Sequence, residues 1–186
     1  MADVHIPAAS QKRLIEIARQ TLEAVIRRCP YPNVGSDDPY LENVNYGAFV
    51  TLFNQEELRG CIGTCTPSGS LRETVTEMTE AAATRDRRVR RVCADELAQI
   101  RIDISVLSPL MRVHDPLALE IGLHGLHVAL ERKRGVLLPQ VATEYGWDMK
   151  TFLEQTCMKA NLARDAWRWP DTVVSSFTAL IIKEEK

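Results

Sequence analysis

The sequence contains no long apolar run. None of its stretches approaches the ~20 consecutive apolar residues that a membrane-spanning helix needs, so we expect no membrane partner for this 186-residue chain. An excess of one charge is also lacking, because acidic and basic side chains nearly cancel to a formal net charge of −2. Such a chain has no strong overall field for a polyanion. We therefore do not expect nucleic acid as its partner, except through a local basic patch.

Signals for secretion are absent as well. Residues 1–5 lack the basic start and the apolar core of a signal peptide. The five cysteines are an odd number, in a chain long enough to bury a core without disulfide crosslinks. We therefore expect reduced thiols and a cytoplasmic location. The length predicts one domain over residues 1–186, or two small lobes that share a core.

The common catalytic signatures are missing too. The sequence has no phosphate-binding loop, no G-x-G-x-x-G dinucleotide motif and no serine-triad signature. Internal repeats and low-complexity segments are also absent. These absences leave the reaction and the cofactor unknown.

Hydrophobic periodicity predicts both helices and strands. Apolar side chains recur every three or four residues over 10–28, where Ser10 is the expected N-cap, and Asp148 is the expected N-cap of a later helix. The predicted helices are 10–28, 71–84 and 147–160, and the predicted strands are 47–53, 58–63, 101–108, 126–130, 136–141 and 173–182. The connections suit hairpins rather than parallel crossovers. We therefore expect an α+β fold with antiparallel β-sheets flanked by helices.

The segment LRGCIG, residues 58–63, places the thiol of Cys61 two positions after the guanidinium of Arg59. Gly60 and Gly63 leave room beside the backbone for a ligand or for another chain segment. A cysteine in such a place can be exposed, and a neighbouring arginine favours its reactive thiolate form. The alternative is structural: the glycines permit a bend at a strand end, and Cys61 packs as a small hydrophobic residue.

A histidine between glycines is the second candidate. His124 lies in the segment GLHGL, residues 122–126, which predicts a turn from which the imidazole can reach a cleft. There it could act as a general base or as the partner of a Cys61 thiolate, and the alternative is a turn histidine that bonds only to the backbone. A zinc site built from Cys61, Cys65, His124 and His127 is a weaker interpretation, because C-x3-C departs from the usual C-x2-C spacing. We expect no metal.

Residues 85–91 concentrate five arginines, which predicts a site for a phosphate or a carboxylate. Arg87 and Arg88 are the candidate ligand-binding residues. The alternative is a solvated loop whose arginines pair with nearby acids such as Glu80 and Glu96. Aromatic residues, which a single-strand nucleic-acid binder would interleave with the arginines, are missing there.

Together these segments resemble the AMMECR family, whose hallmark is the LRGCIG motif. Residues 58–63 match the hallmark completely, residues 122–126 match its glycine–histidine–glycine turn, and residues 104–108 match its central strand. Further segments that match in the same order are 47–51, 138–141, 146–148 and 152–159. The resemblance covers nearly the whole chain.

The resemblance implies two lobes with antiparallel sheets and a cleft between them. The N- and C-terminal parts would build the larger lobe and the middle of the chain the smaller one. The residues that carry over as cleft candidates are Arg59, Gly60, Cys61, Gly63 and His124. Two segments depart from the family pattern. Its Asp-Pro-Arg-Phe reads Asp-Arg-Arg-Val at 86–89, and its Lys-Ala-Gly-Leu carries Asn161 in place of glycine, which can still adopt the left-handed helix-end conformation.

The resemblance also implies partners. Prokaryotic members resemble one component of a three-part system that includes a Memo-like protein and a radical-SAM protein. The human member is linked to transcription, translation or related basic machinery. Two hypotheses follow. The cleft around LRGCIG binds a small molecule or a partner segment, or the chain is an enzyme that uses Cys61 as thiolate nucleophile or redox centre with Arg59 and His124.

Overall fold

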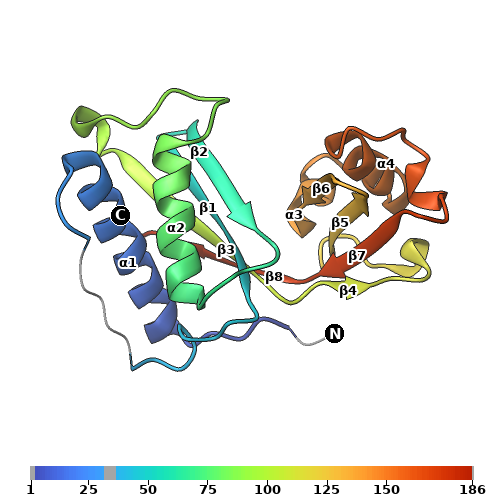
Figure 1. Ribbon diagram of the computed structural model, residues 1–186, viewed down its shortest axis with the longest axis horizontal. Coiled ribbons are helices and arrows are strands. Elements are labelled where there is room, and N and C mark those ends of the chain that lie inside the picture. Colours follow the sequence, from blue (N-terminus) through green and yellow to red (C-terminus); the bar gives the residue numbers. More distant parts are fainter. Residues whose placement is uncertain (1–2, 32–36, 186) are drawn as a thin grey trace. The chain divides into compact units, whose positions relative to one another are not determined.

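The computed structural model describes residues 3–31 and 37–185. These residues form helices and two four-stranded antiparallel sheets, which confirms the α+β prediction. The chain divides into two compact units (Figure 1). We call the described part of His5–Leu107 and Leu180–Lys186 the LRGCIG unit, and Ser108–Ala179 with Asp3 and Val4 the 108–179 unit. The expectation of one domain over residues 1–186 stays a prediction.

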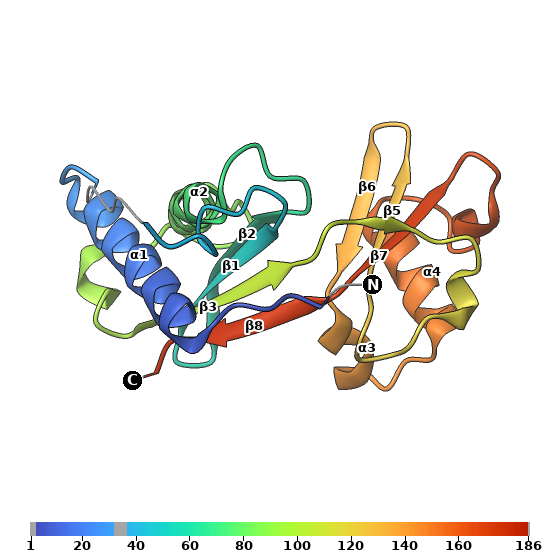
Figure 2. The ribbon, with the colours of Figure 1, turned by 90° about the horizontal axis from the view of Figure 1, so that it is seen from below.

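The LRGCIG unit is a sheet with the strand order β2-β1-β3-β8. Its elements are α1 (Ala8–Arg27), β1 (Gly47–Asn54), β2 (Glu57–Thr64), α2 (Leu71–Thr84), the 3-10 helix η1 (Ala94–Glu96), β3 (Ile100–Leu107) and β8 (Ala179–Lys183). Figure 2 shows α1 and α2 on one face of this sheet. Side chains alternate between the two faces of a strand, and Ala48, Val50 and Leu52 of β1 are fully buried on the helix-covered face.

The predicted boundaries of α2 are confirmed, whereas α1 begins and ends at other residues than predicted. α2 begins with a capping box in which Ser70 and Glu73 each bond the other's backbone N–H, and it covers the predicted 71–84. The expectation that Ser10 caps the first helix is wrong. α1 begins at Ala8 after Pro7, whose carbonyl accepts the N–H of Gln11 at 2.9 Å, and Ser10 is buried in the first turn. Proline has a φ fixed near the helical value, and its missing backbone N–H costs nothing before the first turn, where no carbonyl would accept it. The helix therefore begins two residues earlier than predicted.

The 108–179 unit is a sheet with the strand order β4-β7-β5-β6 and its own core. Its elements are β4 (Met111–Arg112), η2 (Pro116–Ala118), β5 (Gly125–Leu130), β6 (Lys133–Leu137), α3 (Pro139–Glu144), α4 (Met149–Lys159), η3 (Ala166–Arg168) and β7 (Val173–Phe177). Phe152 and Cys157 of α4 pack in that core with Leu126 and Val128 of β5. Asp148 caps α4 as predicted, since its Oδ1 accepts the N–H of Thr151 at 2.7 Å.

Two predicted strands differ from the structure. The strand predicted at 136–141 ends at Leu137, because Pro139 occupies the first turn of α3, where its missing N–H has no cost. The strand predicted at 173–182 is two strands in two different sheets, β7 and β8. Thr178 lies between them, and its N–H donates to Ser108 Oγ at 2.9 Å instead of to a neighbouring strand. The predicted left-handed conformation of Asn161 is confirmed, with φ at 55°.

Candidate functional site

The LRGCIG motif lies in β2, an edge strand of its sheet. The register between β1 and β2 shifts within the motif: Leu52 faces Gly60, whereas Phe53 faces Leu58. Arg59 is therefore the extra residue of a β-bulge. Bulges bend a strand and re-aim a side chain.

The bulge places Arg59 in a buried ion pair with Glu96. Arg59 Nε and Nη2 donate to the two carboxylate oxygens at 2.8 Å each, and both side chains are almost fully buried. Glu96 also accepts the backbone N–H of Cys93 at 2.9 Å and the amide of Asn54 at 3.2 Å. Arg59 and these donors lower the pKa of Glu96 to about 2. The guanidinium that the sequence suggested for Cys61 is thus engaged by Glu96.

The backbone of Cys61 is held by the arginine-rich segment. Its N–H donates to Asp86 Oδ2 at 2.9 Å, and its carbonyl accepts from Arg88 Nη2 at 2.8 Å. Arg88 also forks onto the buried Asp86 carboxylate, at 2.9 and 2.7 Å. Arg88 is the main reason why the pKa of Asp86 lies far below its usual range. This segment satisfies the exposed edge of β2 at Cys61, as a covering loop does for an edge strand.

The Cys61 thiol is half-buried and has two polar neighbours. Thr51, its register partner on β1, donates its hydroxyl to Sγ at 3.3 Å. The pKa of Arg88 is raised chiefly by Asp86, with a further contribution from Cys61. The cation that acts on Cys61 is therefore Arg88 rather than Arg59. Sequence spacing gave no signal for this, since Arg88 is 27 residues away.

The two glycines of the motif have packing roles. A Cβ on Gly60 would lie 2.0 Å from the carbonyl oxygen of Ala82, so the glycine lets α2 approach β2. A Cβ on Gly63 would lie 2.2 Å from the ring of Phe49 on the neighbouring strand. Both positions were ligand-binding candidates, and the structure gives each a requirement for space that involves no ligand.

The rest of the arginine-rich segment is partly paired. Arg85 lies 3.8 Å from Glu80, and Arg90 lies 3.9 Å from Glu96. Arg87 is exposed and forms no ion pair within 3–31 and 37–185. An anion site at Arg87 stays a prediction.

His124 belongs to the other unit. It follows a turn in which Gly122 has φ at 85°, and its Nδ1 accepts the backbone N–H of Glu120 at 3.0 Å. Nδ1 is therefore engaged by the backbone of the turn. Since Cys61 and His124 lie in different units, their pairing in a cleft stays a prediction.

The comparisons with known proteins decide the family. The AMMECR1 family model matches residues 15–182. The chain belongs to the AMMECR1 family. A protein from Methanothermobacter thermautotrophicus is 39% identical over 180 residues, covering 94% of each chain, and Protein TK0174 from Thermococcus kodakarensis is 37% identical, covering 92% of this chain and 89% of its own.

A solved structure shares the fold of this AMMECR1-family chain. The crystal structure of the uncharacterized protein PH0010 from Pyrococcus horikoshii superposes with a TM-score of 0.89 at 34% identity, covering 97% of this chain and 94% of that one. The resemblance stated from the sequence is thereby confirmed. The family assignment names no reaction.

The remaining cysteines differ in their surroundings. Cys29 and Cys93 are exposed, whereas burial raises the pKa of Cys65 to about 11. Cys157 is fully buried, and burial raises its pKa as well. Across the described residues, no three His, Cys, Asp or Glu side chains group so that they could hold a metal ion. Among the same residues, no helix combines the length and apolar character that crossing a membrane requires.

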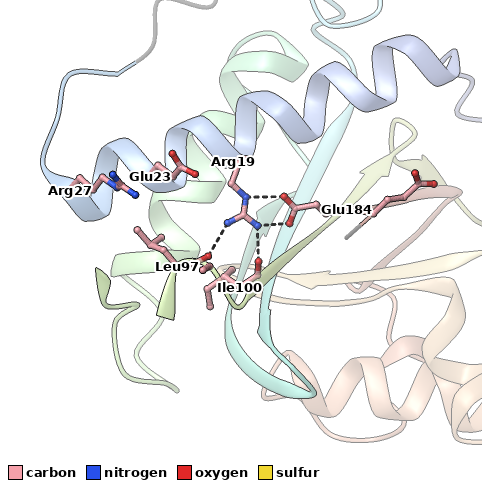
Figure 3. Close-up of a pocket in the computed structure, with 8 residues that line it drawn as sticks. Arg19, Glu23, Arg27, Leu97, Ile100 and Glu184 are labelled. Atoms are coloured by element: carbon pink, nitrogen blue, oxygen red, sulfur yellow. Dashed lines mark hydrogen bonds and ion pairs between the residues drawn. The ribbon is translucent and has the colours of Figure 1, made fainter. Parts of the chain in front are cut away.

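A cavity of about 370 Å³ beside α1 contains a second polar cluster (Figure 3). Arg19 donates to both carboxylate oxygens of Glu184, to the carbonyl of Ile100 at 2.6 Å and to that of Leu97 at 3.2 Å. Glu184 also accepts the N–H of Ile102 at 3.0 Å. These bonds attach α1 to the start of β3, to Leu97 before it and to Glu184 directly after β8. The side chains of Arg19 and Glu184 are thus engaged by the protein itself, and their role here is structural.

Proposed function

We propose that this AMMECR1-family chain is a binding protein, and that the sheet face that carries Cys61 holds a small molecule or a segment of a partner protein. One observation supports this choice most. The charged groups around the motif are engaged by one another, Arg59 by Glu96 and Arg88 by Asp86. What the motif still offers to a ligand is the half-buried thiol of Cys61.

The proposed surface combines a ring, a hydroxyl and a thiol. Phe49 faces Gly63 and Thr51 faces Cys61 in the register of β1 and β2, so these four residues share one face. That face is opposite to the one on which Gly60 contacts α2. Binding sites commonly pair an apolar lining with a few polar groups that fix orientation.

The groups bonded to Cys61 do not include a suitable proton acceptor. Thr51 and Arg88 are donors toward it. Asp86 is the carboxylate among its described partners, and Arg88 holds the pKa of Asp86 too low for it to take a proton from a thiol. A nucleophilic cysteine needs a base or a stabilised thiolate. The bonding around Cys61 therefore favours binding over acid–base catalysis.

Protection from alkylation tests the proposal. The Memo-like and radical-SAM proteins that the family resemblance implies as partners are purified and added separately. Iodoacetamide labelling at each cysteine is then followed by peptide mass spectrometry. We expect a bound partner to slow labelling of Cys61 at least severalfold and to leave the exposed Cys29 and Cys93 unchanged. Binding that leaves Cys61 labelling unchanged would place the interface elsewhere, and no binding by either protein would remove both partners from the proposal.

Enzymatic use of Cys61 as thiolate nucleophile or redox centre is the second candidate. Thr51 donates its hydroxyl to Cys61 Sγ at 3.3 Å, and the Arg88 guanidinium is bonded to the Cys61 carbonyl at 2.8 Å, so a hydroxyl and a cation lie beside the candidate nucleophile. Arg88→Gln should slow alkylation of Cys61 at pH 7 severalfold, whereas Arg87→Gln, which removes the same charge from the exposed neighbour, should not. Equal rates in both variants would leave the thiol without activation. The cytoplasmic location and a role in transcription or translation machinery stay predictions.

A further inference from the structure

A cavity of about 290 Å³ lies within the 108–179 unit, whereas the motif on which the proposed function rests belongs to the LRGCIG unit. Its wall consists of the end of β4 and the residues after it, together with η3, Thr172 and the start of β7. The polar residues that line it are Arg112, His114, Trp167, Arg168 and Thr172. No described Asp or Glu side chain lines it. The cavity is therefore basic, although the whole chain has a formal net charge of −2.

The two guanidiniums of this cavity are not neutralised by the described part of the protein. Arg112, His114 and Arg168 form no ion pair within the described parts of the chain, 3–31 and 37–185. Elsewhere among the described residues, arginines do pair with carboxylates, for example Arg19 with Glu184 and Arg59 with Glu96. Two guanidiniums without an ion pair among the described residues therefore line one hollow, and together they fit an anionic ligand.

A buried hydroxyl gives independent support. Thr172 is 8% exposed, and its Oγ1 has no hydrogen-bond partner among the described residues. Buried polar atoms nearly always have hydrogen-bond partners, and a buried atom without one indicates a place for a ligand or a water molecule. Thr172 lines this cavity, so a ligand oxygen inside it would supply that partner.

Trp167 positions one of the two guanidiniums. The Arg168 guanidinium carbon lies 4.7 Å from the centroid of the Trp167 ring. An arginine stacked on an aromatic ring keeps its N–H groups free in the plane of the guanidinium, and less conformational freedom is lost when it binds. Val113 and Val174 provide apolar wall beside these polar groups.

We propose that this cavity binds the phosphate group of a small phosphorylated molecule. A phosphate monoester carries close to two negative charges and three terminal oxygens, which match two guanidinium forks and one hydroxyl donor. The apolar wall contacts the carbon part of the ligand. A carboxylate, with two oxygens and one charge, leaves part of this donor set unused.

The test is an NMR titration of the full chain, read at the indole N–H of Trp167, which Trp167→Phe assigns. The probes are inorganic phosphate, glycerol 3-phosphate and acetate, each at the same ionic strength in sodium chloride. We expect saturable shifts with both phosphates, tighter binding of glycerol 3-phosphate, and no saturation with acetate. Linear, unsaturated shifts with all three probes, or acetate binding as tightly as phosphate, would overturn the proposal.

Substitutions locate the binding. Arg112→Gln and Arg168→Gln should each weaken phosphate binding about tenfold, the usual effect of losing a charge-assisted hydrogen bond. Thr172→Val should weaken it severalfold, and Thr172→Ser, which keeps the hydroxyl, should retain it. Arg132→Gln makes the same charge change on the exposed turn between β5 and β6 and should have little effect. If Arg132→Gln weakens binding as much as Arg112→Gln, the attraction is only a general charge effect and the cavity is not a site.

Discussion

The two units differ in whether their buried polar groups have hydrogen-bond partners. In the LRGCIG unit the buried charges bond one another, as Arg59 does with Glu96 and Asp86 with Arg88. The 108–179 unit holds all the buried side-chain atoms that lack a hydrogen-bond partner among the described residues. They are His127 Nδ1, Gln140 Oε1, Thr172 Oγ1 and Thr178 Oγ1. An unpaired buried polar group costs stability, so its presence points to a role other than folding.

The motif that stands out most in the sequence and the polar groups that remain free to bind a ligand thus lie in different units. The LRGCIG motif attracts attention by its arginine and its glycines, yet these residues hold an ion pair, a helix contact and a ring contact within one unit. The 108–179 unit, by contrast, has a basic cavity whose two arginines form no ion pair among the described residues. A motif that is conspicuous in sequence can therefore be mainly structural, while binding capacity lies where polar groups remain free.

The largest expected effect is on the buried ion pair of the LRGCIG unit. Arg59→Leu leaves the carboxylate of Glu96 buried without its main partner, and breaking a buried pair in this way costs about 3–5 kcal/mol. Urea denaturation at pH 7 measures the free energy of unfolding. The matched control is Arg87→Leu at an exposed, unpaired position, which should stay within about 0.5 kcal/mol of wild type. A loss below about 1 kcal/mol for Arg59→Leu would mean that the pair contributes little, and the comparison between the units would fail.

Asp86→Asn should have the next largest effect. It removes charge-assisted bonds from Arg88 and from the Cys61 N–H, for a loss of about 1.5–3 kcal/mol at pH 7. The folded-state pKa of Asp86 is depressed, so its contribution is fully present above the unfolded value near ~4 and is lost as the pH falls toward the folded value.

The acid limb of the stability curve checks that reason. Wild type should lose stability steeply below about pH 4, and Asp86→Asn should lose less over the same range. Glu96, with its pKa lowered to about 2, keeps part of the acid sensitivity in the variant. Parallel acid limbs in the two proteins would show that Asp86 is not the stabilising carboxylate.

Much of this unit was predictable from local sequence. The spacing of apolar residues located α2 and the alternation located β3 to within one residue, because these signals depend on neighbours in the chain. The partners of Arg59 and Cys61 were not predictable. A one-residue bulge decides where Arg59 points, and Asp86 bonds Cys61 across 25 residues of sequence because α2, which ends just before Asp86, packs against β2.

The resemblance stated from the sequence bears on Asp86, which was not a candidate, and on Arg88, which was expected to bind a ligand. Asp86 occupies the first position of the segment that reads Asp-Pro-Arg-Phe in the family, and Arg88 keeps the arginine of its third position. These are the two residues that bond the backbone of Cys61. The changed positions, Arg87 and Val89, make none of these bonds, so the departures leave the structural role of the segment intact.

In the 108–179 unit, His127 should make the free energy of unfolding depend on pH. Burial, with a contribution from the charge of Arg134, lowers the pKa of His127 below its usual value. The unfolded chain then binds a proton first, so the contribution of His127 is present above about pH 6.5 and is lost as the pH falls below it. His127→Leu should unfold within about 1 kcal/mol of wild type at pH 7.5, because it removes an atom without a partner. The variant should also lose less stability between pH 7.5 and 5.5, and an unchanged slope would show that His127 does not titrate there.

The smallest expected effect on stability is at Thr178, and it tests most directly whether unpartnered hydroxyls distinguish the two units. Thr178 is 5% exposed and its Oγ1 has no partner among the described residues, whereas the buried Thr79 Oγ1 in α2 donates to the carbonyl of Val75 at 2.7 Å. Thr→Val keeps the shape and removes the hydroxyl at either position. Thr178→Val should change the free energy of unfolding by less than about 0.5 kcal/mol or raise it, while Thr79→Val should lower it by about 1 kcal/mol. Equal losses at the two positions would mean that the Thr178 hydroxyl is satisfied in solution, and the free polar groups of the 108–179 unit would then no longer distinguish it.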